Sequence, residues 1–261
     1  MELEAVPRTT DPVPRPGRNH LSLLSFNIQT GVDTQDFHEY VTKSWKHLLP
    51  LKERISNLNR IAELVQSHDL VGLQEVDSGS LRTGFLDQTE YLAHRARFPY
   101  WYRQVNRSLG KIAQHSNGVL SRIRPHSVDE HKLPGLRGRG AMLVELPTNR
   151  EPLLVCIMHL ALGKRARRLQ LNYISELVGE YSQLVVMGDF NCGTESGELQ
   201  ELADGIPRKE EQPLAFCRLD GGVAIVVAPF RPHSGADWAG AEIGIAQEVL
   251  PEPLVDVGSA G

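Results

Sequence analysis

The sequence predicts an α/β domain in which two β-sheets pack against each other and helices cover their outer faces. Many short apolar runs, typical of buried strands, alternate with only a few amphipathic segments that are typical of helices. The chain has 261 residues, 41% of them hydrophobic, and is therefore long enough to bury a substantial core. Length and composition together suit one domain of this class.

Apolar runs bounded by polar or turn residues indicate the strands. The first run, LSLLSFNI at residues 21–28, follows a proline-rich start over residues 1–20 that we expect to be a flexible tail. The runs at residues 153–160 and 183–189 are almost continuously apolar, which is typical of strands buried on both faces. Further strands are expected at residues 70–76, 100–105, 117–122, 141–146 and 223–228.

Helices are predicted where apolar residues recur at spacings of three and four. Such segments cover residues 51–67, 88–98 and 164–181. In the last of them, the spacing places Leu169 and Leu171 on the face expected to point inward. Because the pattern weakens after residue 207, we expect a single domain over residues 21–261 with an atypical C-terminal segment, 207–261.

Composition argues against several classes of protein. No apolar run approaches the roughly 18 residues of a membrane-spanning helix, and the N-terminus resembles no secretory signal. Cys156, Cys192 and Cys217 form neither a disulfide framework nor a CxxC pair, so a cytoplasmic protein is expected. The net charge of −4 makes a long nucleic-acid track less expected, although it leaves room for a local cationic site.

Polar residues stand at the C-terminal ends of several predicted strands. A rigid strand that ends in a polar residue can present that side chain into a shared cleft. Separate carboxylates with carboxamides beside them suit Mg²⁺ or Mn²⁺, which prefer oxygen ligands and retain waters that a substrate phosphate can replace. The strand-end residues are Asn27, Glu75, His159, Asp189 and Asn191.

Each of these residues also has a structural explanation when it is taken alone. Glu75 suits a solvated loop, and Asp189 within Gly-Asp-Phe-Asn suits a turn. His159 on an apolar strand is more often a packed core histidine than a ligand, and Asn117 before Gly118 is a natural turn pair. It is their joint occurrence that favours a functional site.

The ordered set of motifs resembles the endonuclease/exonuclease/phosphatase superfamily, which includes exonuclease III-like nucleases, deoxyribonuclease I, neutral sphingomyelinases and inositol polyphosphate 5-phosphatases. The resemblance is greatest to bacterial members with the stretch HLALGKRAR. It implies a four-layer α/β/β/α sandwich of two mainly antiparallel sheets, with a cleft at one end. The matching segments are SFNIQTG (25–31), LQEVDSGS (73–80), HSNGVLSR (115–122), LPGLRGRGA (133–141), CIMHLALGKRAR (156–167) and VMGDFNCG (186–193).

The resemblance also implies roles for individual side chains in the hydrolysis of a phosphate ester. Glu75 is expected to bind catalytic Mg²⁺ (or Mn²⁺), and Asn27 to assist the metal or the phosphate. Asp189 is expected to orient or activate the attacking water. The remaining expectations are that Asn191 holds a phosphate oxygen, that His159 donates a hydrogen bond to the phosphoryl group, and that His115 and Asn117 line the cleft.

A basic stretch begins five residues after His159 and contains Lys164, Arg165, Arg167 and Arg168. Lys164 and Arg165 are candidates for binding additional substrate phosphate at the start of a helix. The alternative, a solvated helix face, carries equal weight.

The C-terminal segment departs from the family pattern. That pattern ends in a Leu-Asp-His motif and then a Ser-Asp-His motif, followed by an apolar strand. The best correspondence keeps Asp237 and Asp256 as catalytic candidates and places Val257 where the final histidine is expected. Asp220 is an alternative to Asp237, but it lies farther from Asp256 than one hairpin requires; His233 is a less favoured substitute for the missing histidine.

The sequence thus predicts a metal-dependent phosphoesterase that hydrolyses phosphodiester or phosphomonoester bonds, either a nuclease or a phosphodiesterase of small molecules or lipids. Its partner is expected to be a phosphate-ester substrate, with nucleic acid possible but not favoured by the net charge. The alternative, which follows from Val257, is a catalytically impaired or inactive relative that binds a phosphorylated ligand or protein partner.

Overall fold

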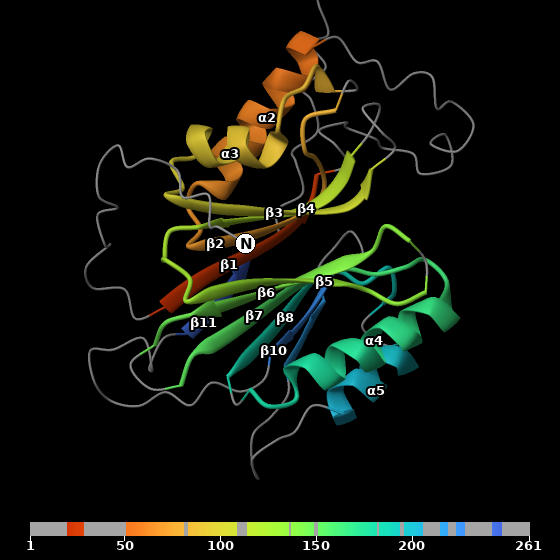
Figure 1. The fold of residues 1–261 in the computed structure, drawn as a ribbon. Coiled ribbons are helices and arrows are strands. Elements are labelled where there is room, and N and C mark those ends of the chain that lie inside the picture. Colours follow the sequence, from red (N-terminus) through yellow and green to blue (C-terminus); the bar gives the residue numbers. More distant parts are fainter. Residues whose placement is uncertain are drawn as a thin grey trace, which may run out of the picture.

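Two β-sheets pack face to face in the computed structural model, and helices cover both outer faces (Figure 1). This arrangement confirms the predicted α/β/β/α sandwich. The structure describes residues 20–28, 51–80, 83–108, 114–135, 137–148, 151–181, 183–193, 196–205, 215–218, 223–227 and 242–246.

The first sheet is five-stranded and mixed. Its strand β1 pairs in parallel with a neighbour on each side, whereas the remaining strands pair antiparallel. In spatial order the strands are β11 (Glu242–Ala246), β1 (His20–Asn27), β2 (Leu70–Asp77), β4 (Gln114–Ser121) and β3 (Tyr100–Ser108).

The second sheet is six-stranded, and only β7 and β8 pair in parallel. All its other neighbours are antiparallel, so this sheet is mainly antiparallel, as predicted. The first sheet is evenly mixed, because two of its pairings are parallel and two are antiparallel. In spatial order the strands of the second sheet are β5 (Ser127–Lys132), β6 (Gly140–Leu146), β7 (Leu153–His159), β8 (Leu184–Asp189), β10 (Val223–Val227) and β9 (Ala215–Arg218).

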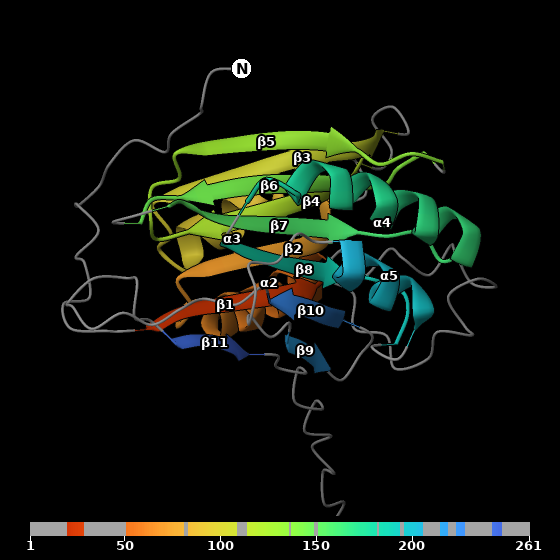
Figure 2. The same ribbon diagram turned by 90° about the horizontal axis from the view of Figure 1, so that it is seen from below.

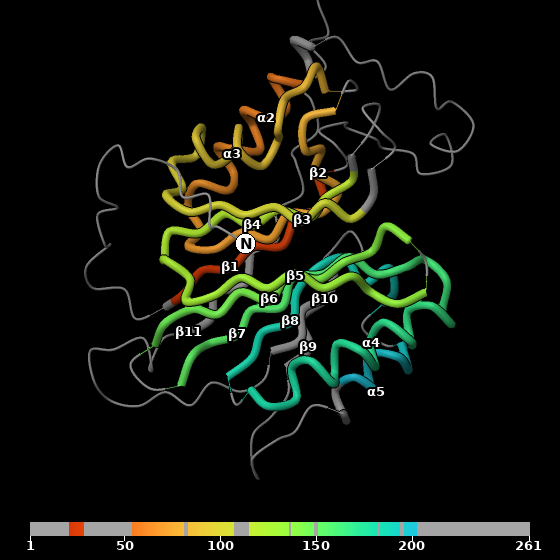
Figure 3. Tube along the Cα trace, in the orientation of Figure 1, coloured from red at the N-terminus to blue at the C-terminus, as the bar shows by residue number. Residues whose placement is uncertain are grey.

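The helices form the two outer layers. Helices α2 (Leu51–Val65) and α3 (Gln88–Arg95) lie on the first sheet, and α4 (Lys164–Val178) and α5 (Gly197–Gly205) lie on the second (Figures 1 and 3). The Asp87 side chain caps α3 by accepting from the backbone N–H groups of Thr89 and Glu90, which begins the helix at a definite residue. None of the helices in the described ranges is long and apolar enough to span a membrane.

Three apolar clusters fill the spaces between the four layers. The period-two alternation of strand side chains assigns neighbouring residues to different layers. Leu23 faces the opposite sheet and Leu24 faces the helices, while Ile157 and Met158 alternate in the same way on β7. Burial on both faces explains why β7 is almost entirely apolar in sequence.

Glycine allows the two sheets to approach each other closely. A Cβ atom at Gly72 on β2 would lie 2.8 Å from a side-chain carbon of Ile157 on β7. The missing side chain thus brings the two sheets together next to the strand ends that carry the polar residues.

Asn117 and Gly118 lie within strand β4, as the strand predicted at residues 117–122 requires, so the alternative explanation of this pair as a turn is wrong. Other elements differ from the prediction. Leu169, predicted to point inward, is 51% exposed, whereas Gln170 beside it is buried and hydrogen-bonded. The sequence pattern did not predict β5, α5, β9 or β11, because their apolar residues are few or irregularly spaced. The predicted N-terminal tail, apart from its last residue, lies outside the described ranges.

Candidate active site

The site forms where the C-terminal ends of parallel strands meet. In the first sheet the parallel register sets Asn27 of β1 opposite Gln74 of β2. In the second sheet it sets His159 of β7 opposite Asp189 of β8. Because the strands of each pair run in the same direction, their polar ends gather at one edge of the sandwich. Figure 2 looks onto the sheets and shows their strands lying side by side.

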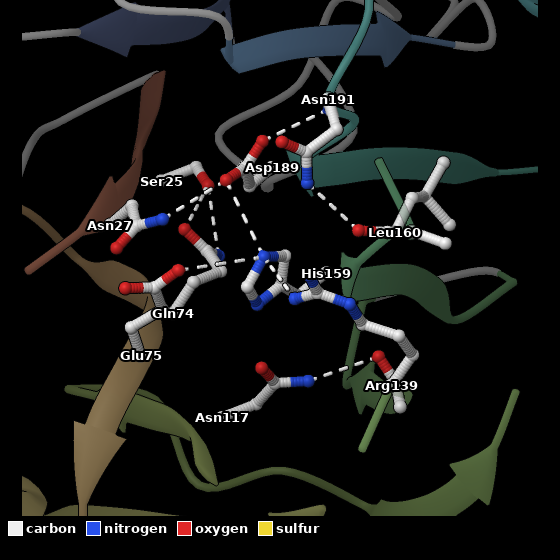
Figure 4. A network of polar contacts seen from close by, with 12 residues as sticks. Ser25, Asn27, Gln74, Glu75, Asn117, Arg139, His159, Leu160, Asp189 and Asn191 are labelled. Carbon is white, nitrogen blue, oxygen red and sulfur yellow. Dashed lines mark hydrogen bonds and ion pairs between the residues drawn. The ribbon is translucent and has the colours of Figure 1, made fainter. Parts of the chain in front are cut away.

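A hydrogen bond joins the two sheets at this edge. The Asn27 amide nitrogen donates to Asp189 Oδ2 at 3.0 Å, although the two residues lie 162 positions apart in the chain (Figure 4). Ser25, one pleat earlier on β1, exchanges hydrogen bonds with the buried Gln74 side chain. These polar contacts hold the site residues of the first sheet in place and align them with those of the second sheet.

Glu75 reaches the site through a β-bulge. The pairing of β2 with β4 shifts register between Leu73 and Val76, both of which face the helical layer. Glu75 has a φ of 55°, an unfavourable value for a residue other than glycine. The extra residue places both Gln74 and Glu75 between two helix-facing neighbours, a common way to redirect a side chain next to a functional site. Strict alternation along β2 would place Glu75 on the helix-facing side, so the sequence pattern alone does not predict that its side chain faces the site.

His159 lies at the centre of the cluster. Its Nε2 atom is 3.8 Å from Glu75 Oε1 and 3.5 Å from Asp189 Oδ2, and the residue is only 6% exposed. Burial, with contributions from Arg139 and His115, lowers the pKa of His159 to about 3. The imidazole is therefore neutral at physiological pH.

Arg139 extends its guanidinium into the same cluster, where Nη1 contacts His159 Nε2 (Figure 4). A guanidinium has only donors, so the histidine nitrogen accepts in this contact. Burial lowers the pKa of Arg139, whereas the Glu75 and Asp189 carboxylates raise it, which places the guanidinium within the field of both carboxylates. Arg139 is not among the site residues predicted from the sequence. Its position in LPGLRGRGA, between two glycines, was the available signal.

Asp189 is held by donors on both of its carboxylate oxygens. Oδ2 accepts from Asn27, and Oδ1 accepts from the backbone N–H of Asn191 at 3.0 Å. Burial raises the pKa of Asp189, and these hydrogen bonds together with Arg139 partly oppose that shift. The neighbouring Gly188 has a φ of 148°, and a Cβ there would lie 1.9 Å from the Met158 carbonyl oxygen. Only glycine therefore fits before Asp189.

Asn191 closes the turn that follows β8. Its φ of 51° lies in the left-handed region, which asparagine tolerates better than most residues. Its side-chain nitrogen donates to the Leu160 carbonyl at 2.8 Å, and Leu160 N–H donates to the Asp189 carbonyl at 2.8 Å. The Asn191 amide thus connects the ends of β7 and β8.

Asn117 and His115 approach the cluster from β4. Asn117 is fully buried, and its amide nitrogen donates to the Gly140 carbonyl in the opposite sheet at 3.0 Å. Its Oδ1 is buried without a hydrogen-bond partner in the described part of the chain, and Figure 4 draws the residue beneath Glu75 and His159. His115 is near enough to His159 to influence its pKa. Both residues therefore border the cluster.

The basic stretch after β7 serves largely to join α4 to α5. Arg167 is buried and pairs with Glu198 at 3.0 Å, and Arg168 pairs with Glu201 at 2.6 Å. Lys164 is 69% exposed and its Nζ lies 3.9 Å from a Glu198 oxygen. Arg165 is exposed on the first turn of α4. Within the described ranges, the structure does not bring Lys164 or Arg165 into the cluster around His159.

The C-terminal candidates fall on residues that the structure does not describe. Asp237, Asp256 and Val257 lie there, as do the alternatives Asp220 and His233. Their placement relative to His159 stays a prediction.

The donor chemistry at the strand ends fits a hard divalent cation. Glu75 and Asp189 supply carboxylate oxygens within reach of one histidine nitrogen, and Asn27 supplies an amide. Within the described ranges, no three His, Cys, Asp or Glu side chains are grouped so that they alone could hold a metal. Mg²⁺ commonly binds through one or two carboxylates and keeps several waters, so a partial protein shell is compatible with it.

Comparison with solved structures supports the fold. An endonuclease/exonuclease/phosphatase from Beutenbergia cavernae matches with a TM-score of 0.54 and 16% identity, covering 79% of this chain and 70% of that chain. A mannosyl-6-phosphatase of Bacteroides thetaiotaomicron matches with a TM-score of 0.52 and 14% identity, covering 79% and 85%. A β-hairpin deletion mutant of Staphylococcus aureus beta toxin matches with a TM-score of 0.56 and 11% identity, covering 93% and 97%.

At these identities the likeness establishes the architecture alone. Among curated proteins, none matches the chain significantly in sequence. The family model described as Endonuclease/Exonuclease/phosphatase family matches residues 24–241, a span that includes every strand-end residue of the cluster. The chain therefore belongs to the endonuclease/exonuclease/phosphatase family, a superfamily of phosphoesterases.

Proposed function

We propose that this protein is a metal-dependent phosphoesterase that hydrolyses a phosphodiester or phosphomonoester bond at the strand-end cluster. The observation that carries the proposal is the meeting of Glu75 and Asp189, from different sheets, at one buried histidine nitrogen. Carboxylates placed together in a partly buried site require a cation or donors to compensate them. A divalent cation would compensate the charge of the carboxylates, and an anionic substrate would bind beside that cation.

The residues of the cluster suit in-line attack of water on phosphorus. Glu75 and Asn27 would hold Mg²⁺ or Mn²⁺, which when bound supplies positive charge to the non-bridging phosphate oxygens. Asp189 is fixed by donors on both oxygens, so it is oriented to accept a proton from, or to align, the attacking water. His159, through the ring nitrogen that carries its proton, and Asn191, through its side-chain amide, would donate hydrogen bonds to phosphate oxygens, a form of stabilisation that preorganised donors provide effectively.

The substrate class that we favour is a small phosphate ester or a lipid headgroup rather than a long polynucleotide. The net charge of −4 does not suit a long nucleic-acid track. One structural neighbour is described as a mannosyl-6-phosphatase, which supports a small phosphate ester as the substrate class. Lys164 and Arg165 remain candidates for contact with a second phosphate group of such a substrate.

Chromogenic esters test the proposal directly. We expect the purified protein to hydrolyse bis-p-nitrophenyl phosphate or p-nitrophenyl phosphate in the presence of Mg²⁺ or Mn²⁺, and to lose activity after chelation. Glu75→Gln and Asp189→Asn should each lower kcat by about 10²-fold or more. Glu176→Gln, at an exposed position on α4, is the matched control and should leave kcat unchanged. Full activity in both site variants would overturn the proposal.

A second candidate function is binding without turnover. It follows from Val257, which stands where the family resemblance expects a catalytic histidine. In that case the wild type binds inorganic phosphate with Mn²⁺ in calorimetry but hydrolyses neither ester, and Val257→His produces measurable hydrolysis. Hydrolysis by the wild type at a rate that Val257→His does not increase would instead favour the enzyme.

A further inference from the structure

The backbone of Arg139 is held in place, whereas its long side chain can adopt different positions. It directly precedes β6, and Leu133 N–H donates to its carbonyl oxygen at 3.0 Å, closing the loop between β5 and β6. The backbone is therefore anchored. The side chain, with several rotatable bonds, can reach more than one acceptor from this position.

In the structure the Arg139 guanidinium lies within the field of the Glu75 and Asp189 carboxylates, both of which raise its pKa. It contacts His159 Nε2, the atom that lies 3.8 Å and 3.5 Å from oxygens of Glu75 and Asp189. Among the residues labelled in Figure 4, only Arg139 carries a permanent positive charge. The guanidinium thus supplies the compensation that two partly buried carboxylates require.

A divalent cation on Glu75 would meet this positive charge at short range. Like charges in a partly buried site repel strongly, since the local dielectric constant is well below that of water. The guanidinium must then either weaken metal binding or move away from the carboxylates. A phosphate ester offers a new acceptor, because guanidinium groups bind phosphate oxygens in a bidentate manner.

We propose that Arg139 is an internal counter-cation of the site, which neutralises Glu75 and Asp189 in the metal-free protein and transfers to the substrate phosphate when a divalent cation binds. The inference rests on the proposed function. It assigns Arg139 two successive acceptors, His159 Nε2 beside the carboxylates and then an oxyanion of the substrate. Metal binding and phosphate binding are therefore coupled through this one side chain.

Calorimetric titration with Mn²⁺ alone tests the first acceptor. We expect Arg139→Gln to bind Mn²⁺ about tenfold more tightly than the wild type, because a repelling charge is removed. Arg139→Lys keeps the charge and should stay within about twofold of the wild type. Arg137→Gln, at an exposed position of the same loop, is the matched control and should also be unchanged.

Titration with inorganic phosphate at saturating Mn²⁺ tests the second acceptor. Here Arg139→Gln should bind phosphate about tenfold more weakly than the wild type, the opposite direction to its effect on Mn²⁺. Arg139→Met is a second neutral variant if Arg139→Gln does not fold, as judged by circular dichroism. Unchanged or weaker Mn²⁺ binding in a folded neutral variant would overturn the inference.

Glu75→Gln separates this inference from the proposed function. If the wild type binds Mn²⁺ and Glu75→Gln does not, the proposed metal site stands whatever the Arg139 variants show. If the wild type itself binds no Mn²⁺, the proposed metal site and the role of Arg139 both fail.

Discussion

The Asn27 amide donates a hydrogen bond to the Asp189 carboxylate at 3.0 Å and thereby links the two sheets at the site. Asn27→Ala removes a donor that orients Asp189 and partly opposes the effect of burial on its pKa. We expect kcat for bis-p-nitrophenyl phosphate to fall by about 10–100-fold, as is usual when an orienting partner is removed. Steady-state kinetics measure the effect. Asn172→Ala, at an exposed position on α4, is the control; an equal loss there would contradict the orienting role.

The backbone strain at Glu75 gives a prediction that concerns stability alone. With a φ of 55°, this position favours glycine, and strain of this kind typically costs about 1–3 kcal/mol. Glu75→Gly should therefore be more stable than Glu75→Ala by about 1 kcal/mol in urea unfolding, although both lack the carboxylate.

A position in a regular strand should show the reverse order of stability for glycine and alanine. At the exposed Asp129 on β5, glycine should be less stable than alanine, because a regular strand gives glycine no conformational advantage. If alanine is also the more stable residue at position 75, the strained bulge is not supported.

Arg122 lies at the end of β2 and β4 that is opposite the site, and it connects this end to the helical layer. Its guanidinium donates to backbone carbonyls that follow α2 and α3, and it also lies 4.5 Å from the Phe98 ring centre. The accepting oxygens belong to Gln66 at 2.5 Å, His68 at 3.0 Å, Arg97 at 3.2 Å and Ala96 at 3.3 Å.

Arg122→Ala should lower the free energy of unfolding by about 2–3 kcal/mol, because four backbone carbonyl groups, two of them on the buried residues His68 and Ala96, lose a charged donor. Chemical denaturation measures the loss, and the kcat of the folded variant should be unchanged. Arg124→Ala, at an exposed position two residues on, should unfold as the wild type does. Equal stability of the two variants would show that Arg122 does not secure this end.

Cys156 is fully buried on β7, and burial raises the pKa of its thiol to about 12. The thiolate is the reactive form, so raising the pH from about 7 to 9 should not make this cysteine reactive while the protein stays folded. Cys192, which is partly exposed, should be alkylated by iodoacetamide under the same conditions. Mass spectrometry of the digested protein reads each position separately. Alkylation of Cys156 in the folded protein would show that β7 opens to solvent.

The strand ends show how far the sequence predicts the site. Asn27, His159 and Asp189 each end an apolar run, and such runs identify buried strands without knowledge of their neighbours. The parallel registers then place these residues side by side. The family resemblance added the order of the motifs. The residues that form strands can thus be predicted from the local sequence, because apolar content and its period are properties of a short segment.

Other features depend on contacts between distant segments. The hydrogen bond from Asn27 to Asp189 and the contact of Arg139 with His159 join different parts of the chain. Gln170 is buried where Leu169 was expected, because its amide satisfies the backbone of Ala161 and Pro134. A buried polar group is stable only where partners are found, and the sequence around it does not specify those partners.

Local sequence patterns were enough to predict two packed sheets with outer helices, the apolar strands and the polar residues at their ends, because hydrophobic periodicity acts over a few residues. The inward orientation of Glu75 at a bulge and the contact of Arg139 with His159 depend instead on the assembled fold. So does the pairing of Glu242–Ala246 with the first strand, from the far end of the chain. Register shifts, charge pairs and long-range strand pairing depend on how the layers pack against one another. The sequence of a single segment does not determine that packing.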